Sequence, residues 1–386
     1  MMNCGLRMIS VLLWVVAGQW ACFGSGQSPE LSGDVAPSVD TSGRNSLADG
    51  KAVEVFQAFG DAEQPGDPSC ARPPCPQDGG NSCDLSGDCD APDFPETCNG
   101  SLTNCDKAFN QVSQVCTHNA FSSVERGFVI PTPNQKYGLE RQLDDGVRCL
   151  MLDIYSSGGD LKLCHGACEL GDDDLHAALV EIRDWLDDHP SEVVSLILET
   201  YVDEELIQAA LVESGLVKKD EAASEASLLY FHNQEAGSPW PTLREMVNLG
   251  QRLVVFSDLD SANGTWNLDW RRYGWETPFN DDSFTCAPGR GDPLAYDNQI
   301  FILNHYTLCS LGGCVETSEE NNDFEFLFSR ASECSAVHPD YNPWGQIPTF
   351  VNVDNYHLPW KGGFTNRPDV FDAVDALNAL SVSRSR

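Results

Sequence analysis

Two histidines each follow an apolar, strand-like run of the sequence. His118 and Asn119 come directly after VSQVCT, and His165 comes directly after LKLC. Histidine suits general acid-base catalysis because its unperturbed pKa of about 6.5 lets both protonation states be populated near neutrality. Buried imidazoles and carboxylates are costly unless they serve a task. Other runs of the same kind also end in polar residues, and these complete the candidate set: Asp153, Glu199, Asp258, Asn304, His305 and Asp354.

The elements that must position these residues alternate between strand and helix. Continuous apolar runs predict strands at 112–118, 147–155, 161–165, 193–201, 228–231, 252–258, 300–306 and 349–356. Helical spacing predicts helices at 174–187, 203–214, 242–249, 322–333 and 368–380. This alternation favours an α/β fold of the TIM (β/α) barrel class, in which the carboxyl ends of the strands carry the active site.

One connection makes the predicted barrel irregular. Residues 156–160 are too few for a crossover between parallel strands, which needs a dozen residues or more. The segment 161–165 is therefore expected to return as the second arm of a hairpin.

Composition excludes some functions and indicates the compartment. The formal charge of -36 and pI near 4.3 argue against nucleic acid, whose binding needs clustered Lys and Arg. Sixteen cysteines indicate an exported protein. Residues 1–22 have the apolar stretch of a signal peptide, and Cys22 is a candidate for lipid anchoring.

Residues 23–97 form a separate, acidic region rich in Gly, Pro, Ser and Asp. The lack of hydrophobic periodicity predicts an extended stalk before a barrel at 98–386. The stalk cysteines are spaced more widely than a zinc knuckle requires, so we expect two local disulfides among Cys70, Cys75, Cys83 and Cys89. In the barrel, Cys164 and Cys168 flank His165 closely, and we expect a disulfide between them.

Several motifs taken together resemble a known family. They are CNGSLTNCDKAFNQVSQVCTHNAFS, GVRCLMLDIY, LKLCHG, SEVVSLILETY, WPTLREMVNLGQRLVVFSD and FVNVDNY followed by DAVDALN. As an ordered set, from Cys98 to Leu380, they are similar to the X domain of phosphatidylinositol-specific phospholipase C, and in particular to its secreted, single-domain relatives. The resemblance implies a distorted TIM barrel, phosphodiester cleavage by two histidines, and a disulfide between Cys98 and Cys105.

The resemblance also implies roles for the two histidines. His118 corresponds to the general base that takes a proton from the inositol 2-hydroxyl, which then attacks the neighbouring phosphorus. His165 corresponds to the general acid that protonates the departing glycerol oxygen. The nucleophile comes from the substrate, so the protein needs no nucleophilic Ser or Cys.

Asn119, Asp153 and Glu199 match three oxygen ligands of calcium in the metal-dependent branch of the family. Calcium favours such hard donors. Met151 departs from the pattern, because that branch has an acid there. The metal-independent branch has an arginine at the Asp153 position, which this chain also lacks, so the sequence leaves calcium dependence open.

Four further residues are candidates for supporting or substrate-binding roles. Asp354 is a candidate to orient His118, and Tyr356 is a candidate to stack on the inositol ring. Arg148 and Lys162 could reach the phosphate, although Arg148 lies inside an apolar strand run, where a structural role is equally compatible with the sequence.

Three classes of function follow from these interpretations. The leading one is a secreted, monomeric phosphodiesterase that cleaves phosphatidylinositol or a related inositol phospholipid at a membrane surface. A glycerophosphodiesterase or phospholipase D-like lyase uses a similar barrel, but normally has a Glu-x-Asp pair where this chain has Met151, Leu152 and Asp153. The third is a non-catalytic lipid-binding barrel, which the intact histidines disfavour.

Overall fold

The computed structural model describes residues 96–217, 227–232, 235–259, 266–279, 283–308, 315–359 and 367–384. The predicted signal peptide with Cys22, and the stalk up to residue 95 with its four cysteines, lie outside these residues. Among the described helices, none combines the length and the hydropathy that a membrane span requires.

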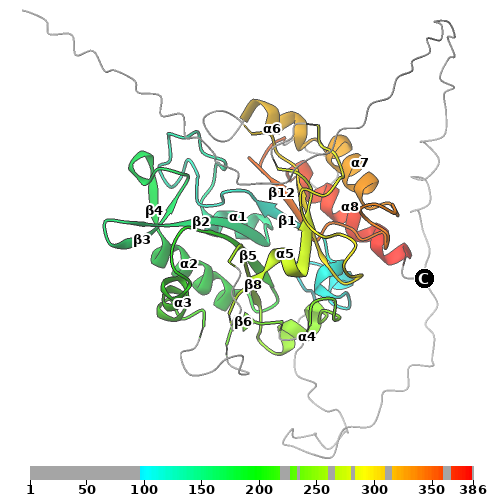
Figure 1. Ribbon diagram of the computed structural model, residues 1–386, viewed down its shortest axis with the longest axis horizontal. Helices are drawn as coiled ribbons and strands as arrows, with labels where there is room; N and C mark the ends of the chain where they lie inside the picture. The colour runs from blue at the N-terminus through cyan, green and yellow to red at the C-terminus, as the bar shows by residue number, and fades with distance from the viewer. Residues whose placement is uncertain are drawn as a thin grey trace, which may run out of the picture. The chain divides into compact units, whose positions relative to one another are not determined.

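The described strands form one curled sheet in the order β10-β9-β11-β12-β1-β2-β5-β7-β6, with β3, β4 and β8 attached at its sides. From β11 to β7 the neighbouring strands run parallel. Figure 1 shows the helices around the outside of this sheet. The arrangement confirms the prediction of an irregular α/β barrel. The strands of the main path and β8 are β1 (Gln114–Thr117), β2 (Cys149–Ser157), β5 (Val194–Thr200), β6 (Leu229–Tyr230), β7 (Leu253–Ser257), β8 (Leu268–Asp269), β9 (Gly274–Glu276), β10 (Arg290–Gly291), β11 (Ile300–Asn304) and β12 (Phe350–Val353).

All five predicted helices are confirmed, with ends shifted by a few residues. Local caps explain where two of them begin. The Asp174 carboxylate accepts a hydrogen bond from the Ala177 backbone N–H (2.9 Å), and Thr242 forms a capping box with Glu245. The helices are α1 (Leu139–Asp145), α2 (Leu175–Asp188), α3 (Glu204–Glu213), α4 (Leu243–Asn248), α5 (Trp270–Tyr273), α6 (Val315–Asn321), α7 (Phe324–Cys334) and α8 (Asp369–Arg384), with 3-10 turns at η1 (Leu102–Asn104), η2 (Phe109–Gln111) and η3 (Cys168–Leu170).

The strands are apolar on both faces because the sheet separates two hydrophobic clusters. In β1, Val115 belongs to the outer cluster beneath the helices, while Cys116 belongs to the inner cluster enclosed by the sheet. In β2, Leu150 and Leu152 pack outward and Met151 packs against the inner cluster. Because side chains alternate along a strand, Asp153 lies on the same inner face as Met151.

The predicted hairpin is confirmed. Strand β3 (Asp160–Cys164) runs antiparallel to β2, and β4 (Asp172–Asp174) adds antiparallel to β3. The tight turn is possible because Gly158 and Gly159 adopt positive φ angles of 65° and 97°, which glycine tolerates without a steric penalty. His165 therefore follows a strand that belongs to a side hairpin, whereas His118 follows a barrel strand.

Disulfides join two pairs of cysteines that the sequence predicted, Cys98 with Cys105 and Cys164 with Cys168. Within the described ranges, two further disulfides were not predicted. One joins Cys116 to Cys149 on the inner face of adjacent strands, and the other joins Cys286 to Cys334 at α7.

Candidate active site

The candidate residues gather at the carboxyl ends of neighbouring parallel strands. Asp153 in β2 is the register partner of Glu199 in β5. The backbone N–H of Asp258, just after β7, donates to the carbonyl of the residue before Glu199 (3.2 Å). The backbone N–H of His118, just after β1, donates to the carbonyl that precedes Asp354 at the end of β12 (3.1 Å). One edge of the sheet thus brings these five side chains together, as the barrel class predicts.

His118 is held on several sides. Its Nδ1 lies 3.0 Å from Oδ1 of Asp354, and the Asn134 amide donates to the same carboxylate oxygen at 3.0 Å. The imidazole stacks on the ring of Tyr306, with centroids 4.0 Å apart and planes 9° apart. Gln135 donates to the His118 carbonyl oxygen at 2.9 Å. A carboxylate at Nδ1 favours the tautomer that carries its proton there, which leaves Nε2 to accept a proton.

Asn134, Gln135 and Tyr306 were missed by sequence reasoning. Asn134 and Gln135 lie in the long connection between β1 and α1, where no periodicity marks them. Tyr306 follows β11 by two residues, and this position after the end of a strand was the one feature of the sequence that could have indicated a role at the site.

Asn119 connects His165 to the carboxylates. In the orientation of its amide that satisfies hydrogen bonding, the amide nitrogen donates to both Asp153 oxygens (3.2 Å each) and the oxygen accepts from His165 Nε2 (3.3 Å). Asn119 has a φ of 46°, in the left-handed region that asparagine adopts more readily than most residues. Burial lowers the pKa of His165, and the neighbouring His118 lowers it further, against an opposing effect of Asp354.

Three carboxylates concentrate negative charge beside this pair. Burial raises the pKa of Asp153 well above its usual range, and the carboxylates of Glu199 and Asp258 raise it further. Glu199 accepts a hydrogen bond from the hydroxyl of Tyr201, and Asp258 accepts from the hydroxyl (2.7 Å) and backbone N–H (3.1 Å) of Thr200. Asp153 also accepts from the Asn119 amide, but it is buried beside the other two carboxylates and its pKa is raised, so it is the carboxylate most in need of a proton or a cation.

The oxygen donors suit a hard cation in kind, but they do not form a complete metal site. Within the described ranges, no group of three or more His, Cys, Asp or Glu residues could hold a metal ion. Met151 contributes a thioether, which accepts from the Asn352 amide (3.2 Å) and offers calcium no hard oxygen ligand. Asn119, Asp153 and Glu199 are the residues that would supply oxygen ligands, and calcium stays a prediction.

Arg148 does not lie at the candidate site. It directly precedes β2, at the opposite end of the strand from Asp153, and pairs with Glu192 at 2.8 Å. It also donates to the carbonyls of Leu143 and Val147, at 2.7 Å each. The structure therefore gives Arg148 a structural role and does not support the predicted contact with phosphate.

Tyr356 is fully buried in the outer cluster, and its hydroxyl donates to Asp145 at 2.6 Å. A ring with no exposed surface cannot stack on a ligand, so the predicted role of Tyr356 is wrong. Tyr201 instead exposes 52% of its surface beside Glu199 and stacks on Tyr155 with centroids 4.2 Å apart. Residues two apart in a strand point to the same face, so its spacing from Glu199 could have identified Tyr201 as a candidate site residue.

Lys162 and His305 are both engaged in structural contacts. Lys162 of β3 pairs with Asp174 (3.4 Å) and Asp172 (3.6 Å) of the hairpin. His305 is buried between the carbonyl of Asn321 (2.6 Å) and the guanidinium of Arg330 (2.9 Å). Burial lowers the pKa of His305 to about 3, so it is neutral and supports the backbone beside Tyr306.

The protein is thus an α/β barrel with two histidines and a set of carboxylates at the carboxyl edge of its sheet. The family model PI-PLC X 1 matches residues 104–359, well over half of the chain. The chain therefore belongs to the PI-PLC X domain family.

Its relatives include two fungal proteins and one plant protein. An uncharacterized secreted protein of Arthroderma benhamiae is 29% identical over 309 residues, covering 74% of this chain and 64% of the relative. A PI-PLC X domain-containing protein 1 of the same fungus is 34% identical, covering 54% of this chain and 68% of the relative. The Arabidopsis thaliana PI-PLC X domain-containing protein At5g67130 is 28% identical, covering 70% and 62%. The chain thus spans about two thirds of the length of these curated relatives.

Solved structures similar to this chain include phosphatidylinositol-specific phospholipase C from Staphylococcus aureus. One mutant of that enzyme has a TM-score of 0.47 at 13% identity, covering 74% of this chain and 98% of the enzyme.

Proposed function

We propose that the protein is a phosphodiesterase that cleaves phosphatidylinositol or a related inositol phospholipid through a cyclic inositol phosphate. The observation that carries this proposal is the arrangement of two histidines at one edge of the barrel, one paired with Asp354 and the other linked through Asn119 to Asp153. Membership of the PI-PLC X family supports the class of reaction.

In this mechanism His118 acts as the base. Its Nε2 accepts the proton of the inositol 2-hydroxyl while Asp354 stabilises the resulting imidazolium through Nδ1. The stacked ring of Tyr306 and the amide of Asn134 keep the imidazole and the carboxylate in this orientation. The oxygen of the inositol then forms a bond to phosphorus and closes the ring.

His165 acts as the acid that delivers a proton to the glycerol oxygen as its bond to phosphorus breaks. The lowered pKa of His165 makes it a readier proton donor, at the expense of the fraction protonated at neutral pH. The exposed Tyr201 ring offers an apolar face to the inositol beside the carboxylates.

The class of substrate is tested by turnover of phosphatidylinositol against glycerophosphocholine. Release of diacylglycerol from the first, without hydrolysis of the second, is the expected result. Preferential hydrolysis of glycerophosphocholine would instead favour the glycerophosphodiesterase alternative. Binding of phosphatidylinositol vesicles without turnover of either compound would favour a non-catalytic barrel.

Calcium dependence is a separate prediction. If Asn119, Asp153 and Glu199 hold calcium, EDTA should lower activity and millimolar calcium should restore it. Met151→Glu should tighten calcium binding because added ligand charge raises affinity, whereas Met151→Leu serves as the matched control. Unchanged turnover in EDTA, with no bound metal by elemental analysis, would contradict the prediction.

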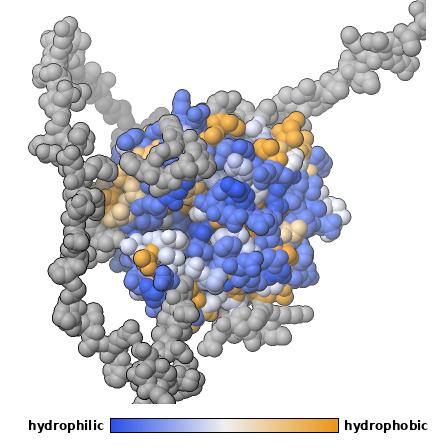
Figure 2. Space-filling model, turned by 180° about the vertical axis from the view of Figure 1, so that it is seen from behind, coloured by the Kyte–Doolittle hydropathy of each residue, from blue (hydrophilic) through white to orange (hydrophobic). Residues whose placement is uncertain are grey.

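Contact with a lipid surface is assigned to three apolar residues in loops beside the candidate site. Val129, Ile130 and Leu170 expose 73%, 55% and 54% of their surfaces. The first two belong to the connection that carries His118, and Leu170 ends the turn after His165. By contrast, the face of the molecule seen in Figure 2 is mainly hydrophilic, with small hydrophobic patches. Exposed apolar side chains near a site for lipid headgroups are suited to enter a membrane interface.

A Val129→Ser/Ile130→Ser variant should therefore bind phosphatidylinositol vesicles more weakly and turn them over more slowly. Its activity on a soluble, short-chain inositol phosphodiester should be unchanged, because the catalytic groups are untouched. Val337→Ser is the matched control, since Val337 is 72% exposed but follows α7 at the other end of the barrel. If both variants lost the same fraction of vesicle binding in a sedimentation assay, the assignment would be contradicted.

We also propose that the protein is exported, with or without a lipid anchor at Cys22.

A further inference from the structure

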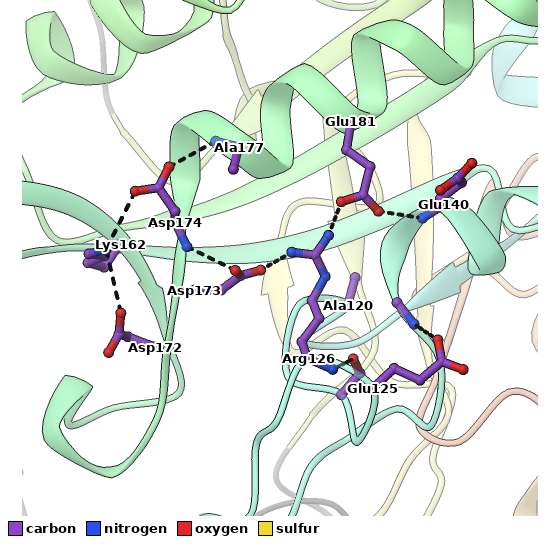
Figure 3. A network of polar contacts seen from close by, with 12 residues as sticks. Ala120, Glu125, Arg126, Glu140, Lys162, Asp172, Asp173, Asp174, Ala177 and Glu181 are labelled. Carbon is purple, nitrogen blue, oxygen red and sulfur yellow. Dashed lines mark hydrogen bonds and ion pairs between the residues drawn. The ribbon is translucent and has the colours of Figure 1, made fainter.

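A single guanidinium ties the connection after β1 to the hairpin and to α2. Arg126 pairs with Asp173 of β4 and with Glu181 of α2, and only 15% of its side chain is exposed (Figure 3). Burial opposes its charge, but the two carboxylates outweigh burial and raise the pKa of Arg126. The arginine is therefore charged at any pH at which the protein is folded.

The contacts continue from Arg126 in both directions. On the hairpin side, Asp173 accepts from the backbone N–H of Asp174 (2.9 Å), whose carboxylate reaches Lys162 on β3 (3.4 Å). On the helix side, Glu181 accepts from the backbone N–H of Glu140 at the start of α1 (2.8 Å). Figure 3 shows these groups as one continuous network.

This network joins the two segments that carry the candidate histidines. Asp173 is the register partner of Leu163, which lies two residues before His165. Arg126 lies in the same connection as His118, Asn119 and Asn134, between β1 and α1.

An apolar contact joins the same segments beside the arginine. The ring of Phe128 covers Gly171 so closely that a Cβ at Gly171 would lie 3.0 Å from it. Phe128 is 3% exposed and packs edge-on against Phe121. The connection after β1 therefore packs onto β4 and the turn before it through both a partly buried ion pair and a close apolar contact.

We propose that Arg126 is a positioning residue, which fixes the hairpin carrying His165 relative to the connection carrying His118. The inference rests on the proposed function, because it concerns the distance between the acid and the base. Reactions that need two groups on opposite sides of one atom are sensitive to their separation, and a misplacement of about 1 Å can lower the rate by about 10²-fold. Arg126 does not contact the reacting atoms and acts through the hairpin.

The experiment compares Arg126→Met, which keeps an apolar stem without the charge, with Asp173→Asn, which removes the charge of the hairpin partner. Two substrates are used, phosphatidylinositol and an inositol phosphodiester with a nitrophenol leaving group. Loosening the hairpin should lower kcat on phosphatidylinositol about ten- to a hundredfold, with little change on the nitrophenyl ester, which needs no proton from His165. Arg183→Met is the matched control, because Arg183 also forms an ion pair on α2, with Asp184, but does not reach the hairpin.

Hydrogen exchange supplies a readout that does not depend on activity. Residues 160–174 should exchange at least tenfold faster in Arg126→Met than in the wild-type protein or in Arg183→Met. Arg126→Lys, which keeps one charge, should restore part of the protection. Equal losses of kcat on both substrates, or unchanged exchange in residues 160–174, would overturn the proposal. If the wild-type protein cleaves neither substrate, the proposed function fails. The hydrogen-exchange rates of residues 160–174 then decide on their own whether Arg126 fixes the hairpin.

Discussion

A His118→Ala variant should cleave phosphatidylinositol roughly 10²- to 10⁴-fold more slowly than the wild-type protein, the usual worth of general acid-base catalysis. The reason lies in the environment of His118, where Asp354 holds Nδ1 at 3.0 Å and Tyr306 stacks on the ring. Among the described residues, no other histidine pairs with a carboxylate, so none could replace the imidazole of His118 as an oriented base. The loss should apply to any leaving group, because deprotonation of the 2-hydroxyl precedes or accompanies attack in every case.

The first product identifies the nucleophile. Phosphorus NMR should show a cyclic 1,2-phosphodiester of inositol, and an analogue without the 2-hydroxyl should not be cleaved. His176→Ala is a suitable control for the removal of an imidazole, since His176 is exposed on α2. A linear phosphate as the first product, or full activity on the 2-deoxy analogue, would rule out the role assigned to His118.

Replacement of His165 by alanine should have a similar effect on phosphatidylinositol but a much smaller effect on a nitrophenyl ester. A glycerol oxygen is a poor leaving group unless it is protonated, whereas a nitrophenolate leaves without a proton. This contrast separates the acid from the base, because His118→Ala should slow both substrates. A His165→Ala variant that loses the same factor on both substrates would contradict the assignment.

The pH dependence gives a second measure of the same role. An acid works only while protonated, and the pKa of His165 is lowered, mainly by burial. Activity on phosphatidylinositol should therefore fall as pH rises through a value below about 6.5, the ordinary pKa of histidine. This descending limb in kcat/KM should be absent with the nitrophenyl ester and in His165→Ala.

The sequence predicted the barrel and the strand-end residues because both depend on local patterns. Apolar runs and helical spacing located the elements, and the short connection before β3 correctly indicated a hairpin. The ends of parallel strands then brought His118, Asp153, Glu199 and Asp354 to one edge, which follows from topology alone.

The incorrect expectations concern directions that a single sequence does not specify. Tyr356 was expected to face a ligand, but it lies on the outer side of the sheet end and bonds to Asp145 on α1. Arg148 directly precedes β2 and therefore lies at the end of that strand opposite to the site. Asn134 and Arg126 come from a long connection without periodicity, so their contacts depend on tertiary packing that no local pattern records.

The placement of the two histidines gives the site uneven local stability. His118 follows a strand hydrogen-bonded on both sides within the barrel, and opening that strand would disrupt the inner and outer hydrophobic clusters. His165 follows a hairpin strand outside the main path of the sheet, which pairs with β2 on one side and with the three-residue strand β4 on the other, and which a disulfide, ion pairs and the Phe128 contact hold further. Peripheral units of this kind open at a lower free-energy cost than central strands. On warming, the acid should therefore leave its working position before the base does, and activity on substrates that need an acid should decline while the barrel is still folded.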